Sequence, residues 1–205
     1  MSEPTIAELL ARIVQLEARA QAAEDYRDIC NLQAAYGYYV DKGLWDKAAD
    51  LFAVGGTLEI AGRGVYVGQD RVRQYLHQLP AYGDGTIYNH MQLQPVVHID
   101  SAAGTAKARW RTLMMVGFLG KEGRWGEATY ENSYVREASS DGSARWRIAS
   151  LHGIINFYAE YDEGWHRGGV PLLRSTSGIE PDRPQSFEYE AHPKAVIAPF
   201  HYDEV

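Results

Sequence analysis

The chain has 205 residues, a formal net charge of −7 at pH 7, and 45% hydrophobic and 23% charged residues. This size and balance predict one packed domain with a short extension at either end, and they exclude a largely disordered chain. The negative charge disfavours a general nucleic-acid binder, because phosphate contacts need a concentrated basic face. No apolar run approaches the roughly 20 residues that span a bilayer, and the N-terminus lacks a basic start and an apolar signal core. We therefore expect a cytoplasmic protein that contacts neither nucleic acid nor membrane.

Cysteine and tyrosine are the informative residue types. The single cysteine, Cys30, excludes an internal disulfide framework and a multi-cysteine zinc site. Fourteen tyrosines accompany five tryptophans and five phenylalanines. Tyrosine joins an apolar ring to a polar tip, so this composition suits a pocket for an aromatic or polycyclic ligand. A dense sheet or a subunit interface uses tyrosine equally well, and composition leaves these alternatives open.

The N-terminal segment, residues 1–24, is expected to form an amphipathic helix outside the main core. Thr5 and Glu8 form a capping-box pattern, in which each side chain bonds a free backbone donor of the first turn. Apolar residues follow at alternating spacings of three and four: Ile6, Leu9, Ile13, Leu16, Ala20 and Ala23. The stripe is typical of a helix–helix seam, although it could pack on its own domain. We favour subunit association and expect a homo-oligomer.

Residues 25–161 are predicted to form an α+β core in which the helices come first. Helical spacing continues through Tyr36 and Tyr39 and ends near Lys42–Gly43, where glycine can adopt the left-handed conformation. The next predicted elements are a short helix over 44–52, strands over 57–61 and 64–68, and an amphipathic helix over 69–79. Gly55-Gly56 is expected to break the chain before the first of these strands.

Four long strands are predicted after these elements. Their ranges are Ile87–Ile99, Ala106–Phe118, Glu127–Glu137 and Arg145–Tyr158, and the turn-rich segment SSDGS joins the last two. The second strand alternates apolar residues with Lys107, Arg109 and Arg111, which indicates one buried face and one wet face. Helices followed by such strands predict a two-layer domain in which a strongly curved antiparallel sheet wraps a helix.

Residues 162–205 form a proline-rich tail without periodicity. The tail also contains Trp165, Phe187, Tyr189, Phe200 and Tyr202, which makes it too aromatic for a plain disordered linker. We interpret the tail as an extended strap that lies across its own subunit or a neighbouring one.

The order of elements and several motifs support a family resemblance over residues 25–161. The stretch YGYYVDKGLWDKAADLF precedes a hairpin and a helix, and YNHMQL, ENSYVRE and ARWRIASLHG follow in the long strands. This arrangement resembles the SnoaL-like branch of the nuclear transport factor 2-like (NTF2-like) superfamily. The resemblance implies a cone of curved sheet, closed by three helices around a deep apolar cavity. The superfamily holds isomerases, dehydratases, cyclases, dioxygenase β subunits and non-enzymes, so activity must be argued from the site.

Asp41 and His90 are the first candidate catalytic residues. A lone strand histidine is more often structural, and an aspartate before glycine is also ordinary turn chemistry. In the scytalone dehydratase-like and bile-acid dehydratase-like members, however, a strand histidine pairs with an aspartate at the end of the first helix. Asp41 and His90 match those places and that separation. A buried carboxylate would orient the imidazole and stabilise its protonated form, which gives a general base.

Tyr36 is the third candidate catalytic residue. The resemblance implies that a tyrosine at this place donates a hydrogen bond to a substrate oxygen, as an oxyanion hole does. Tyr36 precedes Asp41 by five residues, a rotation of about 140° around a straight helix, so the two converge only if the helix end curls inward. A core tyrosine is an equal alternative, and Tyr39 is similarly placed.

The sequence departs from two patterns of the superfamily. Ile60 stands where the isomerases carry an acidic base, which disfavours steroid isomerisation. Met114 or Met115 stands where scytalone dehydratase-like members carry a second histidine. Met114, Trp110 and Phe118 instead indicate an apolar wall that binds aromatic groups, although core packing explains them equally well.

Further residues are expected to bind the substrate, and no metal ligands are expected. The predicted substrate-binding set is Tyr39, Trp45, Tyr88, Trp110, Met114, Asn132 and His152. Alternation puts Glu131 and Asn132 on opposite faces of their strand, and the sequence does not fix which faces the cavity. The sequence contains no HExxH motif, carboxylate cluster or histidine triad at metal-ligand spacing, and no dinucleotide fingerprint.

These residues predict a cofactor-independent lyase that acts on a hydroxylated aromatic or polycyclic small molecule. The leaving group is water or a small carbonyl fragment, since the layout is also loosely similar to the diarylpropane lyases that release formaldehyde from a lignin-derived dimer. Resemblance to the dehydratases favours a trimer over a dimer. The alternative is a non-catalytic ligand-binding module or a β-subunit-like partner of a ring-hydroxylating dioxygenase.

Overall fold

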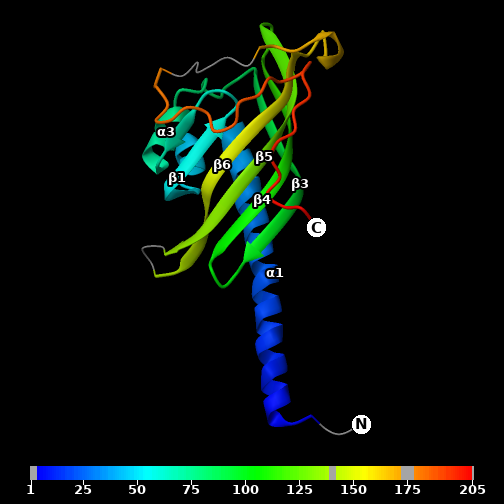
Figure 1. Cartoon of the computed structure of the whole chain (residues 1–205). Helices are drawn as coiled ribbons and strands as arrows, with labels where there is room; N and C mark the ends of the chain where they lie inside the picture. The colour runs from blue at the N-terminus through cyan, green and yellow to red at the C-terminus, as the bar shows by residue number, and fades with distance from the viewer. Residues whose placement is uncertain (1–3, 139–141, 172–177, 205) are drawn as a thin grey trace.

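A curved six-stranded sheet wraps the C-terminal half of a long helix in the computed structural model, which describes residues 4–138, 142–171 and 178–204 (Figure 1). The helices are α1 (Ile6–Asp41), α2 (Trp45–Ala49) and α3 (Gln69–Leu76), and a 3-10 turn, η1 (Trp165–Arg167), follows the sheet. The strands are β1 (Phe52–Ile60), β2 (Val65–Val67), β3 (Thr86–Asp100), β4 (Thr105–Phe118), β5 (Glu122–Ala138) and β6 (Ala144–Glu160). This arrangement confirms the predicted α+β class with a curved sheet and three helices.

The strand order is β2-β1-β6-β5-β4-β3. All neighbouring strands are antiparallel except β1 and β6, which run parallel and place Glu59 opposite His152. The sheet therefore departs from a purely antiparallel arrangement in this one pair. The meander from β3 to β6 brings the last strand back beside β1, which entered the sheet before the helix α3.

Some element boundaries differ from the prediction. Gly55-Gly56 does not break the chain but lies within β1, at an irregularity in its pairing with β6. A Cβ atom on Gly56 would lie 2.7 Å from the carbonyl oxygen of Ile148, so the close approach of β6 requires glycine there. Strand β5 begins at Glu122, earlier than predicted, and α3 ends at Leu76. The first residues of the predicted SSDGS turn lie outside the described residues.

Helix α1 begins with the predicted capping box. The Thr5 hydroxyl accepts the backbone N–H of Glu8, and the Glu8 carboxylate accepts the backbone N–H of Thr5. The helix is continuous, so the predicted boundary at residue 24 falls inside one element. Residues 4–24 are exposed and project beyond the sheet, whereas the buried positions begin at Asp25 (Figure 1). None of the described helices combines the length and the apolar character needed to cross a membrane.

Polar side chains hold the C-terminal half of α1 against the concave face of the sheet. Asp25, which is 2% exposed, accepts hydrogen bonds from Trp146 Nε1 at 3.0 Å and from the Arg136 guanidinium. Two turns later, Gln33 Oε1 accepts from Tyr134 at 2.7 Å and from Asn132 at 3.0 Å. These buried charge-assisted and amide contacts fix the helix in one position along the sheet.

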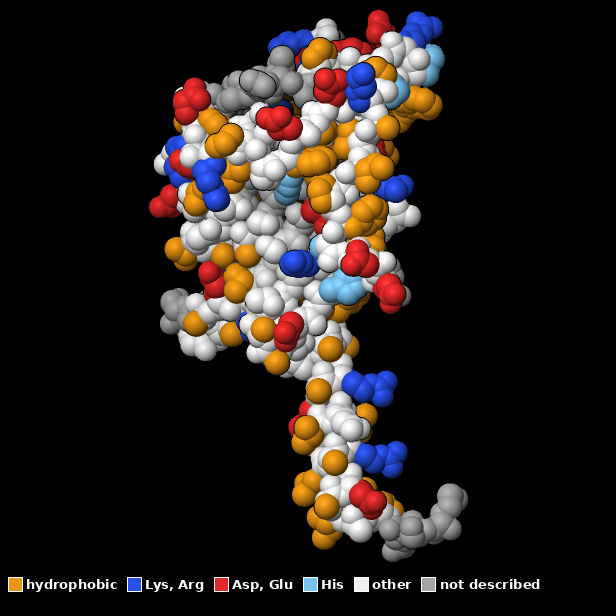
Figure 2. All heavy atoms as spheres, viewed as in Figure 1, with side chains coloured by type: hydrophobic (Ala, Val, Ile, Leu, Met, Phe, Trp, Pro, Cys, Tyr) orange, Lys and Arg blue, Asp and Glu red, His pale blue; other side chains and the backbone are white. Residues whose placement is uncertain are grey.

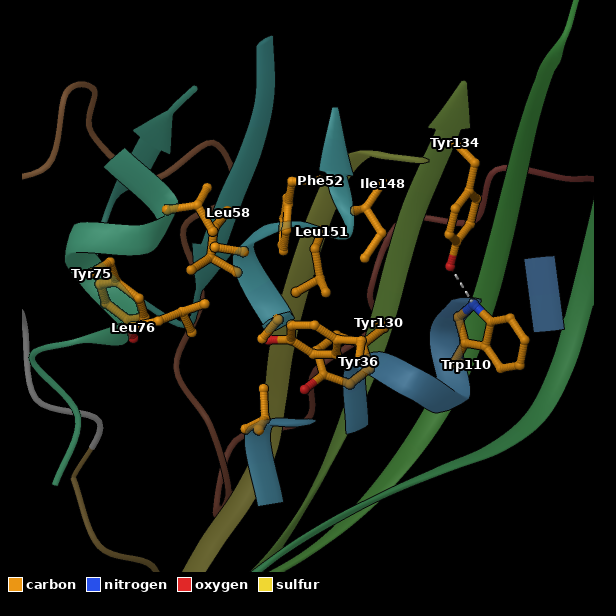
Figure 3. Close-up of a cluster of buried hydrophobic side chains, with 14 of the residues drawn as sticks. Tyr36, Phe52, Leu58, Tyr75, Leu76, Trp110, Tyr130, Tyr134, Ile148 and Leu151 are labelled. Carbon is orange, nitrogen blue, oxygen red and sulfur yellow. Dashed lines mark hydrogen bonds between the residues drawn. The ribbon is translucent and has the colours of Figure 1, made fainter. Parts of the chain in front are cut away.

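Aromatic and aliphatic side chains fill the space between the helices and the sheet (Figure 3). Tyr36 packs edge-on against Phe52 and Tyr130, with ring centroids 6.1 and 6.4 Å apart. Trp110 lies in the same cluster, and its Nε1–H donates to the Tyr134 hydroxyl at 2.9 Å. The tryptophan therefore belongs to the core, with its one polar atom paired.

Residues 183–204 of the tail lie along the outer face of the sheet as an extended strap. Arg183 forms a β-bridge with Val65, and the Tyr189 hydroxyl accepts the backbone N–H of Ile155 at 2.8 Å. Further along, Arg109 Nη2 donates to the carbonyl oxygens of two strap residues, at 2.9 and 3.0 Å. These contacts hold the described part of the strap against its own subunit.

Removal of Asp25 tests the anchor of α1. We expect Asp25→Ala to lower the free energy of unfolding by about 3 kcal/mol, because it leaves the Arg136 guanidinium and Trp146 Nε1 without their buried acceptor. Chemical denaturation measures this difference. Asp28→Ala is the matched control: Asp28 lies on the same helix and pairs with Arg27 at the surface, so its removal should change stability by less than about 0.5 kcal/mol. Equal losses for the two variants would contradict the anchor.

Truncation of α1 tests the predicted oligomer. Ile6, Leu10, Val14 and Leu16 are each more than half exposed, and apolar side chains cover much of the projecting helix (Figure 2). Burying each such side chain contributes about 1.5–3 kcal/mol, so association through this helix is favourable. We expect light scattering to show a homo-oligomer, a trimer in preference to a dimer, and a smaller assembly for a chain that starts at Glu24. A monomeric full-length chain would refute the oligomer, and an unchanged assembly after truncation would refute the role of the helix.

Candidate active site

A cavity of about 320 Å³ lies between the concave face of the sheet and the three helices. Its walls are mainly apolar and aromatic, with contributions that include Tyr36, Val40, Trp45, Ile60, Leu76, Tyr88, Met114, Val116, Phe118, Tyr130, Ile155 and Tyr158. Val170 and Pro171, at the start of the tail, also contribute. A cavity of this size and lining fits a small aromatic molecule.

Asp41 and His90 meet at one wall of this cavity. Asp41 is the last residue of α1, and its Oδ1 accepts the backbone N–H of His90 at 2.8 Å and lies 3.0 Å from Nδ1 of the same residue. The two side chains are 13% and 19% exposed. With the Nδ1 proton directed to Asp41, Nε2 carries the lone pair on the ring, and His90 lines the cavity. This geometry suits a general base whose protonated form the carboxylate stabilises.

Tyr36 contributes a buried phenol to the same cavity. Burial, followed by the nearby Tyr130, Tyr75 and Asp41, raises the pKa of Tyr36 well above its usual value, so the hydroxyl stays protonated. Within the part of the chain that the structure describes, this hydroxyl has no hydrogen-bond partner. It is therefore free to donate to an oxygen atom of a ligand.

Tyr36 and Asp41 reach the site in a different way from the one predicted. The sequence suggested that the helix end must curl inward, yet α1 remains helical through Asp41. The sheet instead curves around the helix, so that Tyr36 meets the cavity while Asp41 contacts β3 behind it. The two side chains leave the helix in different directions: Tyr36 lines the cavity, and Asp41 holds the cavity residue His90.

The structure places some of the predicted substrate-binding residues at the cavity and others elsewhere. Trp45, Tyr88 and Met114 line it. Tyr39, Trp110, Asn132 and His152 do not belong to its lining, so the expectation that they contact a ligand in this cavity is corrected. Whether the residues at the cavity bind substrate stays a prediction.

Each of these four side chains has another environment. Tyr39 lies under the ammonium group of Lys47, 5.8 Å from the ring centroid, and the Trp110 indole is committed to Tyr134. Asn132 is 3% exposed and bonds Gln33, Tyr134 and the backbone N–H of His152. His152 lies on the opposite face of the sheet, as its contacts with Glu59 show.

The structure shows which side chains of β5 face the helices and which face outward. Tyr130, Asn132 and Tyr134 face the helices, whereas Glu131 faces outward and binds Arg109 and His201. In β1, Ile60 lines the cavity and the neighbouring Glu59 faces outward, so the cavity lacks an acidic residue at the place where the isomerases carry their base.

Sequence reasoning missed six polar or charged cavity residues: Arg63, Tyr75, Glu122, Arg124, Tyr130 and Tyr158. Arg63 lies in the β1–β2 hairpin, and its Nη1 donates to the Tyr75 hydroxyl at 2.6 Å. Tyr75 was recognisable on the apolar face of α3, but an arginine in a hairpin carries no periodic signal. Among the described residues, no group of three or more His, Cys, Asp or Glu side chains could hold a metal ion.

A second, polar pocket of about 290 Å³ lies on the outer face of the sheet, beneath the strap. Ser186 of the strap donates its backbone N–H and its hydroxyl to Glu59, at 2.7 and 2.6 Å. His152 Nε2 lies 3.5 Å from Glu59 Oε1. Burial lowers the pKa of His152 below its usual 6.5, although Glu59 and Glu131 oppose this shift.

The lowered pKa of His152 predicts a pH dependence of stability. The unfolded chain binds this proton more readily, so the contribution is fully present above about pH 6.5 and is lost as pH falls through the lower pKa of the folded state. We expect the melting temperature of His152→Gln to fall less than that of the unaltered protein between pH 7.5 and 5. His166→Gln, at an exposed histidine, serves as the control. Parallel pH profiles for His152→Gln and the unaltered protein would contradict the argument.

The sequence and the structure were both compared with known proteins. The profile of the SnoaL-like domain matches residues 21–152. No curated protein matches the sequence.

A candidate scytalone dehydratase from Novosphingobium aromaticivorans superposes with a TM-score of 0.59 at 17% identity, covering 77% of this chain and 99% of that one. Hexachlorocyclohexane dehydrochlorinase LinA-type3 from Novosphingobium barchaimii gives 0.60 at 16% identity, with coverages of 75% and 99%. A protein of unknown function from Mycobacterium tuberculosis gives 0.55 at 18%, with coverages of 67% and 75%. At these identities the structural likeness shows the fold alone.

Proposed function

The chain belongs to the SnoaL-like domain family, and on this premise we propose that it is a cofactor-independent lyase of a hydroxylated aromatic or polycyclic small molecule. One observation carries the proposal: His90, oriented by Asp41, lines a mainly apolar cavity that also holds the phenol of Tyr36, which has no partner among the described residues. The candidate dehydratase and the dehydrochlorinase among the similar structures are named for eliminations, which supports this class of reaction. The breakdown of aromatic compounds is the setting that such a substrate suggests.

The proposed chemistry is an elimination of water. Nε2 of His90 removes a proton from the substrate, the electron pair of that bond forms a new double bond, and the carbon–oxygen bond to the hydroxyl group breaks. The departing hydroxide keeps the electron pair of the broken bond and takes the proton from the imidazolium. Water is thereby released, and the imidazole ring of His90 is neutral again. Asp41 stabilises the imidazolium between these steps, and Tyr36 donates a hydrogen bond to the substrate oxygen that gains charge.

The leaving group can also be a carbonyl fragment, as in loss of formaldehyde from a lignin-derived diarylpropane. A non-catalytic ligand-binding module, or a partner of a ring-hydroxylating dioxygenase, remains the alternative function. Such a protein would use the same aromatic cavity, but it would not require the aligned aspartate, histidine and tyrosine. Kinetic tests of this set therefore separate the two functions.

Substitution of the Asp41–His90 pair tests the proposal. We expect His90→Ala and Asp41→Asn each to lower kcat/KM at least about 100-fold on the hydroxylated diarylpropane or related aromatic alcohol that the unaltered protein converts, because each removes part of the general base. Product absorbance and released formaldehyde measure turnover across such a panel. Circular dichroism verifies that the variants remain folded.

The chain offers a matched control in the surface pair His77–Asp46, whose Nε2 and Oδ1 atoms lie 3.1 Å apart. His77→Ala and Asp46→Asn should leave turnover unchanged. Near-normal kcat/KM in His90→Ala would refute the catalytic pair. Loss of activity in a chelator that zinc or iron restores would refute the cofactor-independent assignment.

A further inference from the structure

Arg63 places a charged group in a cavity whose other walls are mainly apolar. The residue belongs to the β1–β2 hairpin, at the opposite edge of the sheet from His90, with β6, β5 and β4 between their strands. Arginine remains protonated throughout the physiological pH range, so its charge cannot be removed by burial. Its Nε atom is buried and lacks a hydrogen-bond acceptor among the described residues.

The described groups closest to Arg63 are phenols, and the one carboxylate among the described lining residues, Glu122, pairs with Arg124. The Nη1–H group of Arg63 donates to the Tyr75 hydroxyl, and Tyr158 also lies near the guanidinium. Within the described ranges, Arg63 forms no ion pair. Arg124, the other arginine of the cavity wall, differs in this respect, because it binds Glu160 at 2.8 Å and Glu122 at 2.9 Å. The charge of Arg124 is therefore satisfied by the protein, and that of Arg63 is not.

Arg63 is partly buried, and an uncompensated charge in such a place is unfavourable unless an opposite charge binds to it. The Nε–H and Nη2–H groups of one guanidinium edge point the same way and match the two oxygens of a carboxylate. Nη1, on the other side, is held by Tyr75. Because the Tyr75 oxygen accepts this bond, its own hydroxyl proton is free to donate to a ligand oxygen.

We infer that Arg63, with Tyr75, forms a carboxylate-binding subsite in the cavity, so that the substrate is an aromatic carboxylic acid. The inference rests on the proposed function and narrows its substrate class. The carboxylate would bind at Arg63 while the reacting carbon lies at His90, and the aromatic body would occupy the apolar walls between them. A single cation and neutral phenols suit a monoanion better than a phosphate, which requires several positive donors.

Binding of a matched acid and amide tests this subsite without any need for turnover. Calorimetry of the full chain at pH 7.5 should show that 2-naphthoate binds at least about tenfold more tightly than 2-naphthamide, which has the same shape and no charge. Arg63→Gln should abolish this preference while leaving the affinity for the amide unchanged, which also shows that the cavity is intact. Arg63→Lys, which keeps the charge but loses the planar fork, should retain only part of the preference.

Arg111→Gln is the matched control, because this arginine lies in β4 with a side chain 61% exposed; it should retain the full preference for 2-naphthoate. Equal affinities for the acid and the amide in the unaltered protein would overturn the subsite. A preference that survives in Arg63→Gln, or failure of both probes to bind, would also overturn it. A preference that depends on Arg63, found together with no turnover of any hydroxylated aromatic acid, would support the subsite and refute the lyase.

Discussion

The position of helix α1 in the concave face of the sheet determines the rest of the structure. Asp25, Gln33 and Asp41 lie eight residues apart along it, and each reaches different strands: Asp25 contacts β5 and β6, Gln33 contacts β5 and β3, and Asp41 contacts β3. Eight residues turn a helix by about 80° beyond two full turns. Successive anchors therefore follow the curved sheet around the helix, and buried polar contacts of this kind specify one arrangement among many apolar ones.

The last of these anchoring residues, Asp41, also belongs to the candidate catalytic pair with His90. Oδ1 of Asp41 accepts hydrogen bonds from the backbone N–H and from the ring Nδ1–H of His90. The carboxylate therefore fixes the strand and orients the imidazole at the same time. Gly37, one turn earlier, permits this approach, since a Cβ there would lie 3.0 Å from the carbonyl oxygen of His90. Position and chemistry are thus coupled. Asparagine at 41 retains an acceptor for the backbone N–H and removes the charge, which makes Asp41→Asn a sharper probe of catalysis than alanine.

Local signals in the sequence predicted much of this fold and part of the site. The capping box at Thr5, the alternation along β4 and the separation of Asp41 from His90 depend on short-range patterns or on a family resemblance. The period of a strand indicates which face of the sheet a side chain occupies, but not its position along the strand relative to the cavity. Trp110 therefore lies on the predicted inner face, but in the core and not at the cavity. The outward position of His152 depends on pairing between strands distant in the sequence, and the role of Arg63 depends on which side chains surround a hairpin.

The two faces of the sheet treat their charged groups differently. On the outer face, Glu59 is bonded by Ser186, and Glu131 by Arg109 and His201, so the strap and the strands satisfy these carboxylates. His152 among them is partly buried, and this burial lowers its pKa and so favours its neutral form. Arg63 on the inner face has neither remedy, because a guanidinium cannot lose its charge, its described hydrogen bond goes to the Tyr75 phenol, and the Glu122 carboxylate in the same cavity wall pairs with Arg124. A protein that pairs its buried carboxylates with its own residues and leaves one cation open toward a cavity thereby provides for an anionic ligand in that cavity.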